Sequence, residues 1–249
     1  MKIIRGIYAA YAITLFLITF LLFFPLLLIP VIFPRMFHLV GVFNRWWARL
    51  FLALIFIPFE NEYRFKPSDN QRYIFCPNHF SYLDIPTMGL NKVNSIFVGK
   101  SDMENIPLFG FMYRKLHITV NRESLKSRYS TFLKSCEAID EGKNLMIFPE
   151  GGILTTNLPV MTRFKDGAFR TAIEKQIAII PVTIPFNWII LPDYSFLPRW
   201  HKIKVIYHEP IETTGMTLED LPTLKQKTYD VISSELNRQL HGYRQETVK

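Results

Sequence analysis

Residues 72–84, RYIFCPNHFSYLD, join a buried strand to a cluster of polar side chains. The first part, RYIFCP, is a short apolar run of the length expected for a strand inside a sheet, and it ends at a proline. The rest, NHFSYLD, follows at once and carries His79 and Asp84. Because α/β proteins build their sites at the carboxyl ends of parallel strands, the sequence predicts that His79 lies at such an edge.

The same alternation continues through the rest of the chain. Helices are expected at residues 124–142, 163–176 and 217–241, the first because its apolar residues recur at spacings of three and four. Strands are expected at residues 72–77, 95–99, 117–120, 144–149, 178–184 and 203–207. Strands that alternate with helices predict an α/β fold: a mixed, largely parallel central sheet flanked by helices, with an N-terminal helical membrane anchor.

The anchor is expected in residues 1–60, ahead of a globular domain at residues 61–249. Residues 6–34 contain no charged side chain, and about 20 apolar residues suffice to cross a bilayer. A regular helix is expected at residues 6–24, followed by a broken stretch, because Pro25, Pro30 and Pro34 interrupt the pattern. A second apolar segment, residues 39–59, mixes Arg45 with Trp46, which suits the head-group region.

Three arrangements of these first sixty residues stay open. Lys2 and Arg5 precede the apolar stretch and Arg35 follows it, so basic residues flank both ends and a single span has no clear orientation. A hairpin that dips into one leaflet keeps both basic ends on one side, and a buried soluble helix pair is the third possibility. The expected location is the cytoplasmic face of the inner (cell) membrane.

The composition of the chain restricts the classes of partner that it is expected to bind. The chain of 249 residues has 29 Lys and Arg against 21 Asp and Glu, a formal net charge of +8. A basic surface suits anionic lipid head groups or an acidic carrier, and the lack of a long Lys/Arg run argues against nucleic acid. Cys76 and Cys136, the two cysteines, are expected to be small core residues in a reducing compartment rather than a disulfide.

His79 and Asp84 are candidates for general-base chemistry. They are separated by about 140° on a regular helix, so they can meet only if His79 lies in the loop and Asp84 in the first turns of the helix. A carboxylate on one imidazole nitrogen fixes the tautomer, and the other nitrogen can then take a proton from an alcohol. The alternative is a His–Asp hydrogen bond that only caps a helix.

A second cluster, Phe148-Pro149-Glu150-Gly151-Gly152, also follows a buried strand and is expected at the same edge of the sheet. Two glycines after an acid permit a ligand to approach the backbone closely. A tight turn with a solvent-facing Glu150 is an equally good interpretation of this cluster alone.

Together the two clusters resemble the glycerolipid acyltransferase superfamily, typified by 1-acyl-sn-glycerol-3-phosphate acyltransferases. Asn78, His79 and Asp84 match its Asn-His-x-x-x-x-Asp motif, and residues 148–151 match its Phe-Pro-Glu-Gly motif. Further similar segments are residues 100–110, Asn121-Arg122, residues 164–168 and residues 180–182. The match runs in order from about residue 63 to residue 210.

The resemblance implies direct acyl transfer onto the hydroxyl of a lysolipid, most simply 1-acyl-sn-glycerol-3-phosphate to give phosphatidic acid. His79 and Asp84 would be catalytic, and no metal, cofactor or acyl-enzyme would be needed, because the acyl thioester is itself a substrate. The donor would be acyl carrier protein or acyl-CoA. The residues expected to bind the acceptor are Glu150, Gly151, Arg122, Lys100 and Lys165, with bracing of the loop as a second possible role for Glu150.

The sequence departs from the family's pattern in the motifs that are expected to bind the acceptor. The usual Glu-Gly-Thr-Arg-Ser becomes Glu150-Gly151-Gly152-Ile153, and Asn121 replaces the usual acid before Arg122. An O-acyltransferase acting on a lyso-aminolipid of the ornithine or glycine type is therefore an alternative. A non-catalytic lipid-binding protein and a hydrolase are the others, although no Gly-x-Ser-x-Gly elbow supports the last.

Overall fold

The computed structural model describes residues 2–195 and 197–247. The chain divides into two compact units. The first unit comprises the N-terminal segment up to Asn61 together with residues 80–94 and 186–205, and the second comprises residues 62–79, 95–185 and the chain from Ile206 onward. The boundary expected between residues 60 and 61 as a division between anchor and domain stays a prediction.

The helices and strands alternate as the sequence predicts. The helices are α1 (Lys2–Ile32), α2 (Leu39–Leu54), α3 (Asp84–Met88), α4 (Phe109–Leu116), α5 (Leu125–Asp140), α6 (Gly167–Lys175), α7 (Asn187–Ile190) and α8 (Leu221–Thr247), with short 3₁₀ turns η1 (Pro34–Met36), η2 (Ser101–Asn105) and η3 (Leu218–Asp220). The strands are β1 (Phe59–Tyr63), β2 (Tyr73–Pro77), β3 (Ser95–Lys100), β4 (Ile118–Val120), β5 (Asn144–Ile147), β6 (Ala178–Thr183) and β7 (Ile203–Tyr207).

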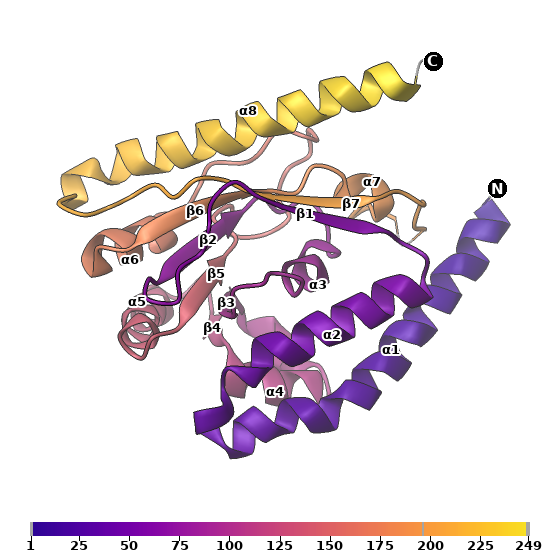
Figure 1. Ribbon diagram of the computed structural model, residues 1–249, viewed down its shortest axis with the longest axis horizontal. Coiled ribbons are helices and arrows are strands. Elements are labelled where there is room, and N and C mark those ends of the chain that lie inside the picture. The colour runs from indigo at the N-terminus through magenta and orange to yellow at the C-terminus, as the bar shows by residue number, and fades with distance from the viewer. Residues whose placement is uncertain (1, 196, 248–249) are drawn as a thin grey trace. The chain divides into compact units, whose positions relative to one another are not determined.

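The strands form a sheet in the order β1-β7-β6-β2-β5-β3-β4. The pairs β2–β6, β2–β5, β3–β5 and β3–β4 are parallel, and β6–β7 is antiparallel. Every residue of β2 and β6 is buried, as strands covered on both faces require. Helices α5, α6 and α8 pack against the strands and against one another in that order (Figure 1). The mixed, largely parallel sheet is thus confirmed.

Helix α1 is longer than the sequence indicates. It runs without interruption from Lys2 to Ile32 and includes Pro25 and Pro30, so the expected break after residue 24 is wrong. Each proline removes one helical N–H bond at a cost of about 3 kcal/mol, whereas unwinding residues 25–32 would leave many backbone groups unpaired among apolar side chains. Only Pro34 lies outside the helix, at the start of η1.

Helices α1 and α2 form an antiparallel hairpin within the first unit, and they run side by side in Figure 1. The Trp47 indole nitrogen donates to the Thr19 hydroxyl at 3.1 Å, and the Phe16 ring packs edge-on against the Trp47 ring. Among the described residues α1 is the one helix long and apolar enough to cross a membrane, and 28% of its most apolar window is buried. Most of that window is therefore uncovered.

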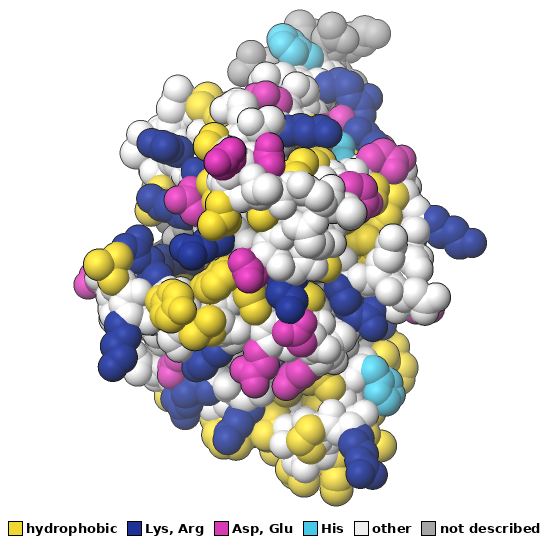
Figure 2. All heavy atoms as spheres, turned by 90° about the vertical axis from the view of Figure 1, so that its left-hand side faces the viewer, with side chains coloured by type: hydrophobic (Ala, Val, Ile, Leu, Met, Phe, Trp, Pro, Cys, Tyr) yellow, Lys and Arg dark blue, Asp and Glu magenta, His cyan; other side chains and the backbone are white. Residues whose placement is uncertain are grey.

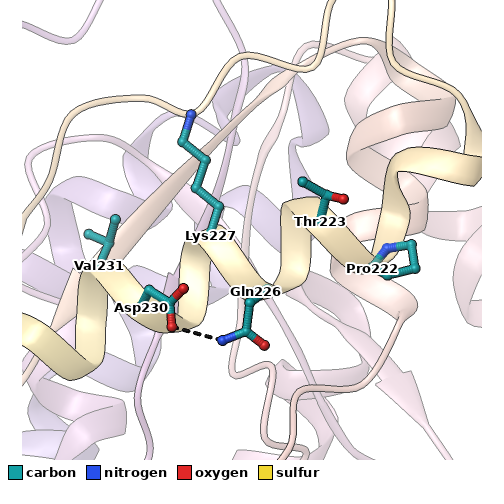
Figure 3. Close-up of a pocket in the computed structure, with 6 residues that line it drawn as sticks. All are labelled: Pro222, Thr223, Gln226, Lys227, Asp230 and Val231. Carbon is teal, nitrogen blue, oxygen red and sulfur yellow. Dashed lines mark hydrogen bonds between the residues drawn. The ribbon is translucent and has the colours of Figure 1, made fainter.

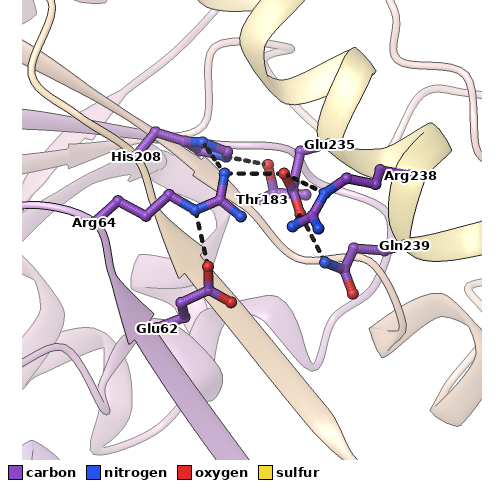
Figure 4. A network of polar contacts seen from close by, with 7 residues as sticks. All are labelled: Glu62, Arg64, Thr183, His208, Glu235, Arg238 and Gln239. Carbon is purple, nitrogen blue, oxygen red and sulfur yellow. Dashed lines mark hydrogen bonds and ion pairs between the residues drawn. The ribbon is translucent and has the colours of Figure 1, made fainter. Parts of the chain in front are cut away.

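Helix α8 is held to the sheet of the second unit by a polar network (Figure 4). Its Glu235 accepts hydrogen bonds from Arg64 at 2.9 Å, from Arg238 at 2.6 Å and from Gln239 at 2.7 Å. Arg64 also donates to Nδ1 of His208 at 3.2 Å, and the His208 Nε2 lies 2.8 Å from the Thr183 hydroxyl. A guanidinium can only donate, so Nδ1 accepts and Nε2 carries the proton.

The surface carries mixed charge. On the face drawn in Figure 2, basic and acidic side chains are interspersed, with hydrophobic patches between them. On this face, opposite charges alternate and the basic side chains form no single band.

Candidate active site

His79 lies in the loop that follows β2, as expected. The strand ends at Pro77, and the next residue, Asn78, is fixed to the end of the neighbouring strand β6. Its side-chain amide donates to the Ile184 carbonyl at 3.1 Å and accepts from the Ile184 N–H at 2.7 Å. This two-way bond between an amide side chain and the backbone sets where the chain leaves the sheet, and so where His79 begins.

Two residues of the second cluster hold His79. Its backbone N–H donates to the Glu150 Oε1 at 2.8 Å, and its imidazole stacks on the Phe148 ring with centroids 4.1 Å apart. Both contacts arise because β2 and β5 are parallel neighbours, so the residues after their carboxyl ends meet. His79 keeps 8% of its surface exposed. The expectation that the two clusters share one edge of the sheet is confirmed for His79 and Glu150.

Glu150 is fully buried and has partners on both oxygens. Its Oε2 accepts from the Thr162 backbone N–H at 2.9 Å and from the Thr162 hydroxyl at 3.2 Å. Burial raises the pKa of Glu150, and the bonds from His79 and Thr162 oppose that rise. With an exposed fraction of 0% and three donors, Glu150 has the contacts expected of a residue that braces the loop. Its role in binding the acceptor stays a prediction.

The two glycines after Glu150 form a turn with cations beside it. Gly151 has φ +82° and Gly152 φ +157°, a backbone region that favours glycine. A Cβ on Gly151 would lie 3.4 Å from the Lys165 Cγ, and a Cβ on Gly152 would lie 3.4 Å from the Arg122 Nη1. The Lys165 N–H also donates to the Pro149 carbonyl at 2.8 Å. The structure thus brings Gly151, Lys165 and Arg122 together.

Lys100 ends β3, where its backbone pairs with Val120, two residues before Arg122. It forms an ion pair with Asp102 in η2, and its side chain is half exposed. Arg122 is partly buried, and this burial lowers its pKa, while the charges of Tyr113 and Asp102 act to raise it. The candidate cations at the Gly-Gly turn are therefore Arg122 and Lys165, and binding of the acceptor by all three side chains stays a prediction. Arg163, one residue beyond Thr162, is exposed.

Asp84 is the first residue of α3, in the first unit, so the expected order of strand, loop and helix is confirmed. Its Oδ2 accepts from the backbone N–H groups of Phe80 at 2.8 Å and Ser81 at 2.9 Å. Its Oδ1 accepts from the Asn187 side-chain amide at 2.9 Å. The carboxylate is 1% exposed and folds the short loop 80–83 around itself. Its pairing with the His79 imidazole stays a prediction.

Sequence reasoning missed Thr162 and Asn187. Thr162 donates hydrogen bonds to Glu150, and Asn187 donates one to Asp84. Both lie in irregular or very short elements, Thr162 before α6 and Asn187 at the start of α7, where no periodicity marks a residue. The expected helix from residue 163 in fact begins at Gly167. Residues 162–166 instead lie across the turn after β5, because the backbone N–H groups of Thr162 and Lys165 donate to Glu150 and Pro149.

Cys76 is placed as expected, in the middle of the buried β2, with an exposed fraction of 0%. Burial raises the pKa of its thiol, which disfavours the thiolate that a nucleophile requires. Within residues 2–195 and 197–247 no group of three or more His, Cys, Asp or Glu side chains is arranged to hold a metal ion. The expectation that the reaction needs no metal stays a prediction.

A surface hollow on α8 has no share in this cluster. It is lined by Pro222, Thr223, Gln226, Lys227, Asp230 and Val231, all from one helix (Figure 3). Gln226 donates to Asp230 at 2.8 Å across it. A hollow formed by one helix turns few side chains toward a ligand, so it is a poor substrate site.

Comparisons with known proteins agree with these motifs. A family model described as Acyltransferase matches residues 57–185, which include both clusters and Thr162. A 1-acyl-sn-glycerol-3-phosphate acyltransferase of Haemophilus influenzae is 28% identical over 207 residues, covering 79% of this chain and 81% of that one. A lyso-ornithine lipid O-acyltransferase of Pseudomonas aeruginosa is 33% identical over 152 residues, covering 60% of this chain and 56% of that one.

The fold is also that of a solved structure. The crystal structure of the 1-acyl-sn-glycerophosphate (LPA) acyltransferase of Thermotoga maritima superposes with a TM-score of 0.75. The alignment covers 94% of this chain and 97% of that chain at 17% sequence identity. At this identity the likeness concerns the fold, which extends over nearly the whole of both chains.

Proposed function

This chain belongs to the acyltransferase family, and we propose that it transfers a fatty acyl group from a thioester to the free hydroxyl of 1-acyl-sn-glycerol-3-phosphate, giving phosphatidic acid. One observation carries the proposal: an imidazole at the carboxyl end of β2, with its backbone fixed by the Glu150 carboxylate of the second motif. That arrangement lies inside the matched residues 57–185.

The reaction needs one base and no protein nucleophile. The His79 imidazole takes the proton of the acceptor hydroxyl as its oxygen attacks the thioester carbonyl carbon. A C–O bond forms, a tetrahedral oxyanion results, and its collapse breaks the C–S bond. The leaving thiolate takes the proton from the imidazolium, so His79 returns to its starting state. The acyl group is already activated as a thioester, and the proposal includes no metal and no cofactor.

Asp84 and Glu150 have separate roles in this proposal. Asp84 would fix the tautomer of His79 and stabilise the imidazolium that forms during attack. Glu150, buried and bonded to the His79 N–H, would set the position of the loop that carries the base. Because proton transfer requires the base within hydrogen-bond reach of the hydroxyl, small displacements of this loop would reduce the rate.

The acceptor is proposed from the cations at the Gly-Gly turn. Arg122 and Lys165 lie beside Gly152 and Gly151, and guanidinium and ammonium groups both suit a phosphate. The Haemophilus relative, which aligns with 79% of this chain, is named for 1-acyl-sn-glycerol-3-phosphate. Ile153 in place of the family's arginine, and the Pseudomonas relative named for lyso-ornithine lipid, support a lyso-aminolipid as the alternative acceptor.

The donor and the location complete the proposal. Acyl carrier protein and acyl-CoA both present an anionic partner to a chain of net charge +8. The long, mostly uncovered apolar helix α1 would hold the chain on a membrane, where lysolipid acceptors reside. We propose the cytoplasmic face of the cell membrane, because the thioester donors are made in the cytoplasm.

A panel assay with the purified full-length chain tests the proposal. Acyl-CoA and acyl carrier protein thioesters are each offered with lysophosphatidic acid, lyso-ornithine lipid or no acceptor. Phosphatidic acid as the dominant product supports the proposal, and acylated lyso-ornithine lipid as the dominant product selects the alternative acceptor. Free fatty acid in all three conditions would show a hydrolase.

The matched control is His79→Ala, which removes the proposed base from the loop after β2 and leaves the neighbouring strands unchanged in sequence. It should lose acyl transfer and keep the wild-type circular dichroism spectrum and membrane binding. Undiminished turnover in this variant, or no turnover of any donor–acceptor pair by the wild type, would overturn the proposal.

A further inference from the structure

Three segments of the first unit meet around the end of α2. The Tyr8 and Tyr11 hydroxyls of α1 donate to the carbonyls of Ile55 at 2.7 Å and Leu54 at 2.8 Å. From the loop before β7, the Trp200 indole nitrogen donates to the Phe56 carbonyl at 2.7 Å. These bonds satisfy two carbonyls that the end of α2 leaves without partners, and the carbonyl of Phe56 just beyond it.

The loop before β7 is also tied to the start of α1. The Arg5 guanidinium donates to the Pro198 carbonyl at 3.3 Å and to the Leu197 carbonyl. Tyr8, Tyr11, Phe56 and Trp200 are called the aromatic collar below. The collar is therefore built from α1, from the residues after α2 and from the loop before β7, and hydrogen bonds join all three.

Phe56 occupies a backbone position that normally belongs to glycine. The Ile57 N–H bonds to the Leu52 carbonyl at 3.0 Å and the Phe56 N–H to the Ala53 carbonyl at 3.1 Å, which is the Schellman arrangement at a helix end. In that motif the residue at Phe56 has a left-handed conformation, and here φ is +58°. A bulky residue there is a genuine outlier and costs on the order of 1–3 kcal/mol.

The strain at Phe56 is not offset by packing. Its side chain is 71% exposed, while its neighbours Ile55 and Ile57 are buried. Trp200 is 67% exposed, although its one polar side-chain atom, the indole nitrogen, already has a hydrogen-bond partner. Two large aromatic side chains are thus held outward. Phe56 has no polar side-chain atom and the Trp200 indole N–H keeps its partner, so neither side chain would lose a hydrogen bond on entering an apolar medium.

The surroundings of the collar indicate a bilayer surface. Ile4 and Ile7, which directly precede Arg5 and Tyr8 on α1, are 71% and 66% exposed. Lys2 and Arg5 on α1 and Arg199 beside Trp200 add positive charge. Tryptophan and tyrosine with apolar bodies and nearby basic residues are typical of the head-group region of a membrane, and basic residues favour anionic lipids.

We propose that Phe56 and Trp200 insert into the interfacial region of an anionic phospholipid bilayer, giving the chain a membrane contact outside α1. This rests on the membrane location in the proposed function and adds a segment far from α1 in sequence. Because the loop before β7 belongs to the same compact unit as α1 and α3, the contact would fix the depth of that unit against the bilayer surface.

Depth-dependent quenching tests the position of Trp200. The full chain is reconstituted into vesicles of phosphatidylcholine and phosphatidylglycerol in which bromine atoms lie either near the head groups or near the chain ends. The difference between wild type and Trp200→Phe isolates the Trp200 signal. Stronger quenching by the shallow bromines is expected, and a Trp200 component that neither lipid quenches would overturn the proposal.

A second variant, Phe56→Gly, tests membrane insertion without lowering the stability of the fold. Phe56→Gly relieves the left-handed strain, so its thermal midpoint should equal or exceed that of the wild type. Flotation at limiting phosphatidylglycerol-containing lipid should nevertheless weaken by about tenfold, the value expected for losing one buried phenyl ring. A lower midpoint with unchanged flotation would show that Phe56 is a packing residue and would overturn the proposal.

The matched control is Leu125→Ser, which removes a side chain that is 73% exposed at the start of α5 in the second unit. It should leave flotation unchanged. Neither quenching nor flotation measures acyl transfer, so failure of this inference would leave the proposed reaction standing, and an inactive chain could still pass both tests.

Discussion

Glu150 joins the two sequence motifs by a hydrogen bond, beside the stacking of Phe148 on His79. One oxygen accepts from the His79 N–H, and the other accepts two bonds from Thr162. Because a buried carboxylate needs donors on both oxygens, the loop 155–164 and the loop after β2 are fixed by the same group. The position of the proposed base therefore depends on a residue that lies far along the chain.

Glu150→Gln should separate bracing from acceptor binding. The amide has one accepting oxygen, so either His79 or Thr162 faces an NH₂ group and a buried N–H loses its partner, at about 1–3 kcal/mol. We expect kcat to fall by at least about tenfold, because the base is displaced, with little change in the KM for the lysolipid. Steady-state kinetics would measure both. A raised KM with normal kcat would contradict this and assign Glu150 to the acceptor.

Thr162→Val removes one of the two bonds to the Glu150 Oε2 and keeps the side-chain shape. A bond of this kind contributes about 0.5–1.5 kcal/mol, so kcat should fall roughly threefold, and Thr162→Ser should restore it. The control is Thr155→Val, which deletes a hydroxyl bond to the Val160 carbonyl in the same loop without touching Glu150. Equal kinetic losses in Thr162→Val and Thr155→Val would show a general loosening of the loop.

The candidate residues differ in how far the sequence could predict them. His79 and Glu150 each follow a run of buried residues, so their meeting at one edge follows from the parallel sheet. Thr162 and Asn187 could not be found, because their roles come from contacts with residues distant in sequence and neither lies in a periodic pattern. A short-range pattern shows which element a residue belongs to and is silent about its partners across the fold.

Helix α1 illustrates the same limit for a whole element. Its composition predicts a long apolar helix, and the structure has one, but the prolines were expected to end it. The helix propensity of a residue includes the cost of a proline. It does not include the larger cost of leaving the neighbouring backbone N–H and C=O groups without hydrogen bonds among apolar side chains. The boundaries of β2, β3, β6 and β7 agree with expectation to within a residue or so, because buried strands leave an uninterrupted apolar run.

The network at α8 should make the fold sensitive to acid. Burial, followed by the Arg64 charge, lowers the pKa of His208 to about 4, so the folded chain keeps His208 neutral where an unfolded histidine titrates near its ordinary value of about 6.5. As the pH falls through this window, the unfolded state binds the proton first and stability is lost. Burial would raise the pKa of Glu235, but its bonds from Arg238, Arg64 and Gln239 together lower it to about 2.

Thermal unfolding at a series of pH values tests this. The wild type should lose on the order of 2–3 kcal/mol between pH 6.5 and 4, and His208→Gln, which has no proton to gain, should lose less over the same range. Below pH 4.5 both proteins should lose further stability, because Glu235 takes up a proton in the unfolded state before it does in the folded state. Parallel pH curves for the two proteins down to pH 4 would contradict the role given to His208.

The division of the chain into these two compact units could not be predicted from the sequence. Residues 80–94, which follow β2, and residues 186–205, which follow β6 and include the start of β7, join the N-terminal hairpin in the first unit. No low-complexity linker marks where the chain passes from one unit to the other. The α/β class was predictable because it depends on alternation along the chain, whereas compact units depend on long-range contacts.

The net charge of the chain gives a prediction about its donor. With 29 basic and 21 acidic residues, the protein should attract an acidic carrier protein over distances comparable with the Debye length, about 10 Å at 0.1 M salt. At saturating lysolipid in neutral detergent micelles, kcat/KM for the acyl carrier protein thioester should fall by roughly tenfold as salt is raised from about 0.01 to 0.5 M, and kcat should hold steady. The same titration with acyl-CoA is the control, since a small donor presents fewer charges and should show a shallower slope. Equal slopes for the two donors would mean that the carrier's protein surface makes no electrostatic contribution to its encounter with this chain.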